Sequence, residues 1–276
     1  MEKIDLEYAK KSFREYLQSY DQKDEKIKLK RIHTFCVVDA AEYICRHERL
    51  SQEDTQLALL IALLHDIGRF EQLKKYNSYD DNIMDHADFG VQVLFQEGMI
   101  RKFLETQEYD ELIRQAIANH SRYALPEIAD ERALLHCRII RDADKLDNFR
   151  VKATESLEAH FDVSKEVVEK ETVSDNILEA IRENRCILRG ERTTHLDMWI
   201  SYLAFIFDLN FPSSFRYILE HDYVNHNIDR MAYASEVTRG RMEEIRNICL
   251  EYLEKDRKST RLNSSHSAKS RMPSSA

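Results

Sequence analysis

One stretch of the chain decides which fold to expect: residues 58–71, which read ALLIALLHDIGRFE. Its first seven residues are apolar and form helices well, so they predict a helix that is buried on every side. His65 and Asp66 interrupt this apolar run, and Gly68 follows where a glycine commonly ends a helix. We therefore expect a buried helix at residues 52–66 that finishes in a histidine–aspartate pair.

Helical periodicity continues on both sides of this segment. Only 5 Gly and 3 Pro occur in 276 residues, too few for the many turns of a sheet-rich protein. Ser51 and Asp54 form a typical N-cap and acidic first turn for the buried helix. The pattern predicts an all-α fold. The expected helices cover residues 5–20, 25–48, 52–66, 82–97, 109–120, 130–149, 152–160, 174–185, 196–208, 213–221 and 224–254, with a loop at 69–81.

The end of the chain differs in composition from the rest. From Asp256 it reads DRKSTRLNSSHSAKSRMPSSA, which is rich in serine and lacks apolar periodicity. Such a segment cannot bury a core. It also resembles a translated sequencing-adapter read-through. We therefore expect residues 256–276 to be a disordered or artefactual tail outside the fold.

Composition narrows the class of protein. The formal net charge is −9, so the surface repels nucleic-acid backbones and a polymeric nucleic-acid partner is not expected. The five cysteines form no C-x-x-C pair and no signal peptide precedes them, which predicts reduced thiols in a cytoplasmic protein. The longest apolar run, Leu57–Leu64, is too short to span a bilayer, so no membrane association is expected.

Several histidine and aspartate residues within the predicted helices are candidates for a functional role. Beside the pair at positions 65 and 66 these are His33 in RIHTFCVV, His86 in DHADFGVQVLF, His120 in AIANHSRYALP and Asp144 in RIIRDADKLDNFR. A lone histidine on a helix is usually an ordinary core or surface residue. We assign that bland interpretation to His47, His136, His160, His195, His221 and His226.

The order His, His-Asp, Asp resembles the HD-domain superfamily of metal-dependent phosphohydrolases, over about residues 28–150. The resemblance implies an HD-type helical bundle at residues 1–150 and a helical C-terminal extension at 151–255 that packs on it. His86 and His120 resemble the two additional histidines of the binuclear branch. The GYP signature of one subgroup is missing, because SRYALPE follows His120, and HDIGRFE lacks the acidic pattern of the ppGpp hydrolases.

The resemblance implies that six residues bind two divalent transition-metal ions, with Mn, Fe, Co, Ni and Zn all open. The ligand set is His33, His65, Asp66, His86, His120 and Asp144. Neutral imidazoles and carboxylates suit such ions, and Asp66 is the expected bridge between them. Asp142 competes with Asp144, but the two lie about 200° apart on a helix, and the A-D-K-L-D-N match favours Asp144. Asp147 is expected to support the site or to cap the helix surface.

Phosphate binding also requires positive charge near the ions. Arg69, Arg122 and Lys145 each follow a predicted ligand closely and are the expected substrate-binding residues. Asp66, Lys145 and Arg69 are the expected catalytic residues. The predicted activity is hydrolysis of a phosphomonoester or phosphodiester, with a nucleotide among the candidates, by metal-activated water. Two alternatives stay open: a mixed-valence di-iron oxygenase with the same ligands, and a non-catalytic regulatory module.

Overall fold

The computed structural model describes residues 4–79, 81–155 and 163–269, with side chains up to Lys255. The described residues contain helices and no strand, which confirms the predicted all-α fold. The chain forms two compact units, Met1–Asp147 and Asn148–Ala276, and helix α7 contributes to both. None of the described helices has the length and apolar character needed to cross a membrane.

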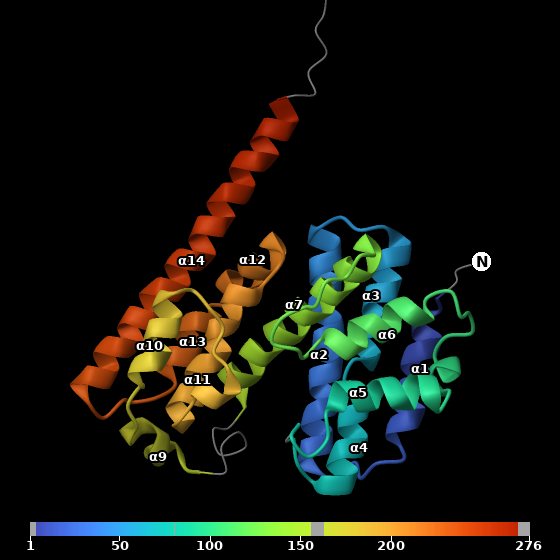
Figure 1. Cartoon of the computed structure of the whole chain (residues 1–276), viewed down its shortest axis with the longest axis horizontal. Helices are drawn as coiled ribbons and strands as arrows, with labels where there is room; N and C mark the ends of the chain where they lie inside the picture. Colours follow the sequence, from blue (N-terminus) through green and yellow to red (C-terminus); the bar gives the residue numbers. More distant parts are fainter. Residues whose placement is uncertain (1–3, 80, 156–162, 270–276) are drawn as a thin grey trace, which may run out of the picture. The chain divides into compact units, whose positions relative to one another are not determined.

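Helix α3 is the centre of the N-terminal unit (Figure 1). All eight residues from Leu57 to Leu64 are buried, as expected for a helix that is apolar on every face. Helices α1, α2 and α6 pack on α3, while α5 packs on both α4 and α6. The helices of this unit are α1 (Leu6–Leu17), α2 (Glu25–His47), α3 (Gln52–Leu64), α4 (Ile67–Tyr76), α5 (His86–Val91), α6 (Asp110–Asn119) and α7 (Glu131–Thr154), with a π-helical turn η1 (Gln92–Gln96) and a 3-10 turn η2 (Met99–Lys102).

Helices α2, α3 and α5 each begin at a side-chain cap that the sequence supplies. Ser51 accepts a hydrogen bond from the backbone N–H of Asp54, as predicted, and so starts α3. Asp24 caps α2 and Asp85 caps α5 in the same way. These caps matter for the site described below, because the first residue of α5 is His86.

The prediction that Gly68 ends the buried helix is wrong, and so is the predicted loop over residues 69–76. Helix α3 ends at Leu64, Asp66 leaves the helical conformation at φ −104° and ψ 17°, and α4 begins at Ile67. Gly68 lies inside α4, close to α5. A side chain at this position would collide with α5, because a Cβ would come 2.2 Å from the carbonyl oxygen of His86. The glycine thus serves a helix crossing and not a helix end.

The C-terminal unit is built around α14. Helices α10, α12 and α13 pack on α14, and α11 packs on α9 and α10. Trp199 of α11 is buried, and its indole N–H donates to the carbonyl oxygen of Asn227. The elements are α9 (Lys165–Lys170), α10 (Asp175–Arg182), η3 (Arg189–Glu191), α11 (His195–Leu203), η4 (Ala204–Asp208), α12 (Pro212–Glu220), α13 (Tyr223–Asp229) and α14 (Glu236–Lys269).

Two helix predictions in this unit need correction. The single helix expected at 224–254 is broken between Asp229 and Glu236, because Met231 and Tyr233 turn into the core and the Tyr233 hydroxyl donates to Ile228. The helix expected at 152–160 is the end of α7 up to Thr154, and residues 156–162 lie outside the described part. The helix α9 was not predicted.

The predicted tail is described in part. Its backbone is helical as far as Lys269, as the end of α14, while the side chains from residue 256 onward and residues 270–276 lie outside the described part. Whether the tail contributes to folding therefore stays a prediction. The predicted packing of the C-terminal extension on the core also stays a prediction.

Candidate metal centre

Six predicted ligands come together inside the N-terminal unit. His33 lies in the middle of α2, whereas His65 and Asp66 form the turn between α3 and α4. His86 is the first residue of α5, His120 caps the end of α6, and Asp144 lies on α7. Five of the six are buried, and the side chain of Asp144 keeps 20% of its surface exposed. The cluster is therefore dry on most sides and reachable at Asp144.

Each of the four imidazoles is anchored through Nδ1, which leaves Nε2 facing the cluster. A backbone carbonyl can only accept a hydrogen bond, so for His65 and His120 it requires the proton on Nδ1 and a free lone pair on Nε2. Carboxylates hold the other two rings. The pairs are His33 with Asp147 Oδ2 at 2.6 Å, His65 with Ala62 O at 2.7 Å, His86 with Asp81 Oδ1 at 2.7 Å, and His120 with Ile117 O at 2.7 Å.

Asp66 lies between the four Nε2 atoms. Its Oδ2 is 3.6 Å from Nε2 of His33 and 3.6 Å from Nε2 of His65. Its Oδ1 is 3.4 Å from Nε2 of His86 and 3.8 Å from Nε2 of His120. Asp144 completes the first group, with Oδ1 3.2 Å from Nε2 of His33. Each oxygen of one carboxylate thus faces its own pair of imidazoles.

These donors fit divalent cations. Ligand atoms of His33, His65 and Asp144 lie within 4.8 Å of one another, and so do those of His65, Asp66 and His120. In the described part of the chain the buried Nε2 of His65 has no hydrogen-bond partner. Several imidazole lone pairs that converge on carboxylates are the donor set that transition-metal ions favour. The residues present therefore fit a metal ion. The observation that supports this fit is the buried His65 Nε2 atom without a hydrogen-bond partner among the described residues.

Two cations of the protein compensate the charge of Asp66. Lys30 Nζ is 2.6 Å from Asp66 Oδ2, and Arg69 Nε is 4.0 Å from Asp66 Oδ1. Burial opposes ionisation of Asp66, but the nearby charges, that of Lys30 first, hold its pKa well below the usual carboxyl value. Asp66 is consequently an anion at neutral pH, as a bridging ligand must be.

The electrostatics keep two of the imidazoles neutral. Burial, together with the nearby charge of His86, lowers the pKa of His120 to about 3. Burial likewise lowers the pKa of His65. For His33, burial and Lys30 lower the pKa, yet the hydrogen bonds to Asp144 and Asp147 raise it overall. The shifts at His65 and His120 both favour the neutral imidazole, the form that can bind a metal.

The structure puts the predicted phosphate binders in different surroundings. Arg69 lies on α4 and not in a loop, and its Nη1 and Nη2 atoms bind Asp81 at 2.7 and 3.2 Å. Lys145 is buried on α7, where its Nζ lies 3.4 Å from the carbonyl oxygen of Arg141. The substrate roles of both residues stay predictions.

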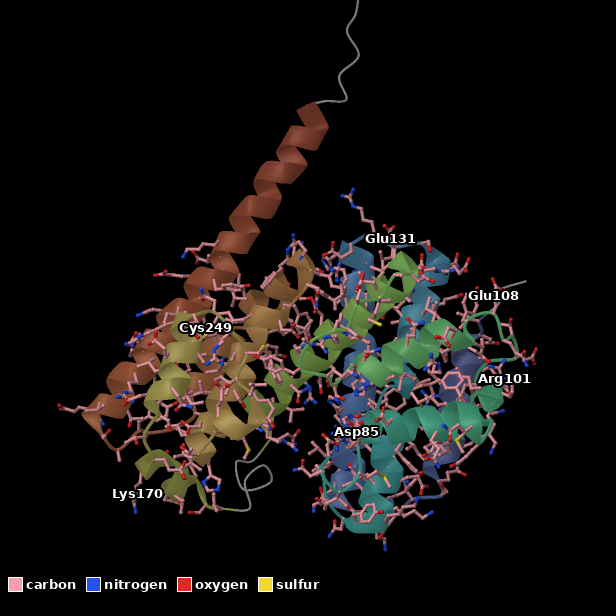
Figure 2. The ribbon with its side chains drawn as sticks, viewed as in Figure 1. Asp85, Arg101, Glu108, Glu131, Lys170 and Cys249 are labelled. Carbon is pink, nitrogen blue, oxygen red and sulfur yellow. The ribbon has the colours of Figure 1, made fainter. Side chains whose placement is uncertain are left out.

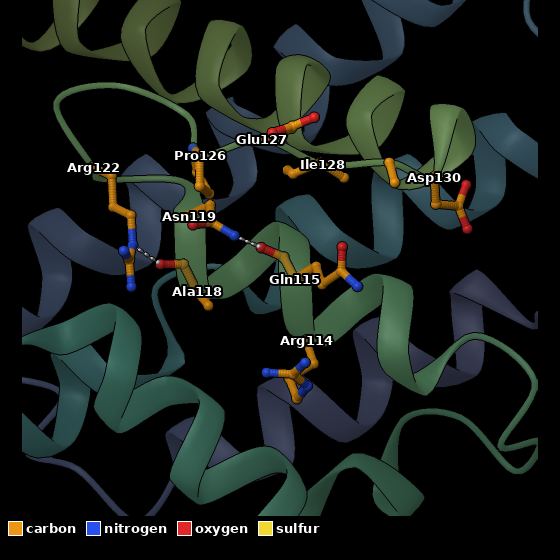
Figure 3. A pocket seen from close by; sticks show the side chains of 10 residues that line it. Arg114, Gln115, Ala118, Asn119, Arg122, Pro126, Glu127, Ile128 and Asp130 are labelled. Carbon is orange, nitrogen blue, oxygen red and sulfur yellow. Dashed lines mark hydrogen bonds between the residues drawn. The ribbon is translucent and has the colours of Figure 1, made fainter.

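Arg122 belongs to a separate hollow on the surface. It follows α6, its Nε donates to Ala118 O at 3.3 Å, and its side chain is exposed. Figure 3 shows it with Arg114 beside a cavity of about 550 Å³. The cavity is lined by Arg114, Gln115, Ala118, Asn119, Arg122, Pro126, Glu127, Ile128, Ala129 and Asp130, a set that includes none of the six predicted ligands.

Four other acidic residues lie close to the predicted ligands in the sequence. Asp147 supports the site, since it holds His33. Asp85 caps α5 and Asp88 is exposed. Asp142 is fully buried. Among the described residues it is Asp144, and not Asp142, whose carboxylate lies within 4.8 Å of the ligand atoms of His33 and His65.

Two residues at the site were missed from the sequence. Lys30 precedes His33 by three positions on α2, so helical spacing could have identified it. Asp81 lies between α4 and α5, five positions before His86, and accepts a hydrogen bond from His86 Nδ1. No local pattern marks it.

Comparison with known proteins agrees with this geometry. The family model described as HD domain matches residues 31–149, a range that includes all six predicted ligands. No curated protein and no solved structure matches the chain. The matched range, its helical fold and the histidine–aspartate turn between α3 and α4 agree with one another. Residues 31–149 are therefore an HD domain, and the chain is a member of the HD-domain superfamily.

Proposed function

We propose that this HD domain binds two divalent transition-metal ions and hydrolyses a small phosphomonoester or phosphodiester, with nucleotides among the candidate substrates. HD domains are in general metal-dependent phosphohydrolases. The observation that supports two ions is the position of Asp66: Oδ2 faces His33 and His65, and Oδ1 faces His86 and His120. A carboxylate that faces two donor groups can bridge two ions.

His33, His65, Asp66 and Asp144 would hold one ion, and His86, His120 and Asp66 the other. Two bound ions would lower the pKa of water and polarise the phosphate. The chain's own residues supply the rest. The Nδ1 anchors keep four Nε2 lone pairs aimed at fixed points, so little reorganisation precedes reaction. The burial of the cluster excludes bulk water.

Positive side chains at the cluster suit an anionic substrate. The Nε atom of Arg69 is buried and has no hydrogen-bond partner among the described residues. Lys30 lies beside Asp66, and its side chain is 18% exposed. Since the exposed fraction of Asp144 is 20%, we infer that substrate reaches the cluster between α2 and α7. Lys30 and Lys145 are then the candidate phosphate contacts on these two helices.

The test is a screen of phosphorylated metabolites and nucleotides with Mn²⁺, Fe²⁺, Co²⁺, Ni²⁺ and Zn²⁺ added separately. We expect phosphate release that continues without oxygen, and close to two ions per chain by elemental analysis. Asp66→Ala should lose both the ions and the turnover, because it removes the bridge. Turnover that requires iron and consumes oxygen would favour the oxygenase alternative instead. Two bound ions without turnover on any substrate would favour a regulatory module.

A further inference from the structure

The buried Arg141 links α7, which carries Asp144, to the end of α6, which carries His120. Arg141 lies on α7, one turn before Asp144, and only 2% of its surface is exposed. Its guanidinium binds backbone carbonyls. Nη1 donates to the carbonyl oxygens of Asn119, His120 and Arg122, at 3.1 Å for Asn119 and 3.4 Å for His120. Nη2 donates to Tyr123 O at 3.4 Å.

The carbonyls of Asn119 and His120 belong to the end of α6, where a helix leaves its last acceptors without intrahelical partners, and those of Arg122 and Tyr123 follow just after it. His120 is the C-cap of α6, so the guanidinium binds the backbone of a predicted ligand directly. A positive charge at a helix C-terminus is also favourable towards the helix dipole. In the absence of Arg141, several buried carbonyls would lose a donor, and the last turn of α6 would no longer be held.

Of the two histidines of the second group, His120 is held at that last turn. His120 Nε2 lies 3.0 Å from His86 Nε2 and 3.8 Å from Asp66 Oδ1. Its Nδ1 is anchored to Ile117, which is in the same helix end. The His33 group is held by other elements, since His33 is anchored to Asp147 and His65 to Ala62. Loosening the end of α6 therefore affects one group of ligands and spares the other.

We propose that Arg141 is a positioning residue for the second metal ion: it clamps the end of α6 so that His120 faces Asp66. This proposal rests on the two-ion centre of the proposed function and not on the reaction that the centre performs. Removing a residue that orients a ligand typically weakens metal binding by about 10- to 100-fold. That loss should fall on the ion bound by His86 and His120.

The chain offers a matched control at the opposite end of the same helix. Arg101 donates to the carbonyls of Glu105 and Thr106 and pairs with Asp110, the first residue of α6. Figure 2 shows Arg101 at the edge of the N-terminal unit. Arg101→Ala also removes arginine–carbonyl hydrogen bonds next to α6, without touching the end that bears His120.

The experiment is calorimetric titration of metal-free protein with Mn²⁺ alone, in variants that isolate each ion. In a His33→Ala background only the second ion remains, and there Arg141→Ala should weaken its binding by about 10- to 100-fold. In a His120→Ala background Arg141→Ala should leave the remaining ion unchanged. Arg101→Ala should change neither. Arg141→Lys serves where the alanine variant does not fold, and it should retain part of the binding, because an ammonium reaches fewer carbonyls.

Chemical rescue is a second test, and it measures whether added guanidinium restores the affinity for the second ion. Millimolar guanidinium should enter the space left in Arg141→Ala and restore binding of the second ion, with no effect on Arg101→Ala. Equal weakening in both backgrounds, or wild-type affinity in Arg141→Ala, would overturn the proposal. Wild-type protein that binds fewer than two ions would overturn the metal centre and this proposal together. Failure to find a substrate would contradict the hydrolase assignment alone.

Discussion

At the scale of single residues, the site depends on how each imidazole is oriented. His33 shows this most directly, because its Nδ1 lies 2.6 Å from Asp147 Oδ2 while its Nε2 lies 3.2 Å from Asp144 Oδ1. The two carboxylates are one helical turn apart on α7 and hold opposite edges of one ring. Asp147 thereby fixes which nitrogen faces the metal centre.

Replacing Asp147 with alanine should weaken binding of the first ion by about 10- to 100-fold, since His33 would lose its orientation. Metal titration measures the affinity directly. Asp88→Ala is the control, because Asp88 is an exposed carboxylate two positions from a predicted ligand. If both variants bind metal like the wild type, Asp147 does not orient His33.

Lys145 tests phosphate binding separately from metal binding. Losing a charge-assisted contact made in the transition state costs about 1.5–3 kcal/mol, or about one to two decades in rate. Lys145→Ala should therefore lower turnover on the substrate found by the screen and leave the metal content intact. Wild-type turnover in this variant would show that the buried ammonium serves α7 alone.

At the scale of elements, the centre depends on a close crossing of α4 and α5. Gly68 of α4 permits this approach, since a Cβ there would come 2.2 Å from His86 O and 2.6 Å from Gly90 N. Both neighbours are backbone atoms and cannot turn aside as a flexible side chain would. The HDIG stretch therefore uses its glycine to bring the first residue of α5 next to Asp66.

Gly68→Ala should push α5 away from α4 and move His86 out of reach of Asp66. We expect a loss of about 1–3 kcal/mol in unfolding free energy, typical of overpacking, and loss of the second ion. Gly240→Ala provides the contrast. Gly240 is exposed on α14, and no described atom lies within 4 Å of the position that an added Cβ would take. That change should stabilise the protein by about 0.4–1 kcal/mol. Undiminished metal binding by Gly68→Ala would contradict the role of the crossing.

At the scale of the whole molecule, each unit has its own buried polar network. In the C-terminal unit the network centres on Asp197 of α11, which is fully buried. Asp197 accepts from the backbone N–H and hydroxyl of Ser174, at 3.0 and 2.6 Å, and from the backbone N–H of Thr193 at 3.0 Å. One carboxylate thus joins the start of α10 to the start of α11. Burial opposes its ionisation, but these hydrogen bonds lower the pKa overall.

Asp197→Asn should destabilise this unit by about 2–3 kcal/mol at neutral pH, because an amide cannot accept from all of these donors. The folded pKa lies below the ordinary value of 3.8, so the carboxylate stabilises the fold above that value. Its contribution disappears as the pH falls through the folded pKa. The difference between wild type and variant should therefore shrink in acid.

Urea unfolding followed by fluorescence can measure this pH dependence. The chain has 1 Trp, and Trp199 is buried in α11, so its emission reports on the C-terminal unit. The titration should extend from neutral pH to below 3.8. A difference between the two proteins that stays constant over this range would contradict the assigned role of Asp197.

The sequence by itself determined the helical class, most helix positions and the order of the candidate ligands along the chain. These features are local: helical periodicity, caps such as Ser51, and the apolar run into His65 each depend on residues a few positions apart. Helix geometry showed that only one of Asp142 and Asp144 can face the site, and the resemblance of A-D-K-L-D-N to the family favoured Asp144. Local reasoning was wrong at Gly68, because the absence of a side chain there is required by the backbone of α5 and not by a helix end.

Only the tertiary structure decided how the ligands are aimed. His33 meets Asp147 across 114 positions, Lys30 meets Asp66 across 36, and Arg141 meets the end of α6 across 18 to 22. No spacing rule links such pairs, because their contact depends on how the helices pack and not on helical period. The chain's pattern thus specifies which residues can bind a metal. Packing specifies which nitrogen and which carboxylate oxygen each of them presents.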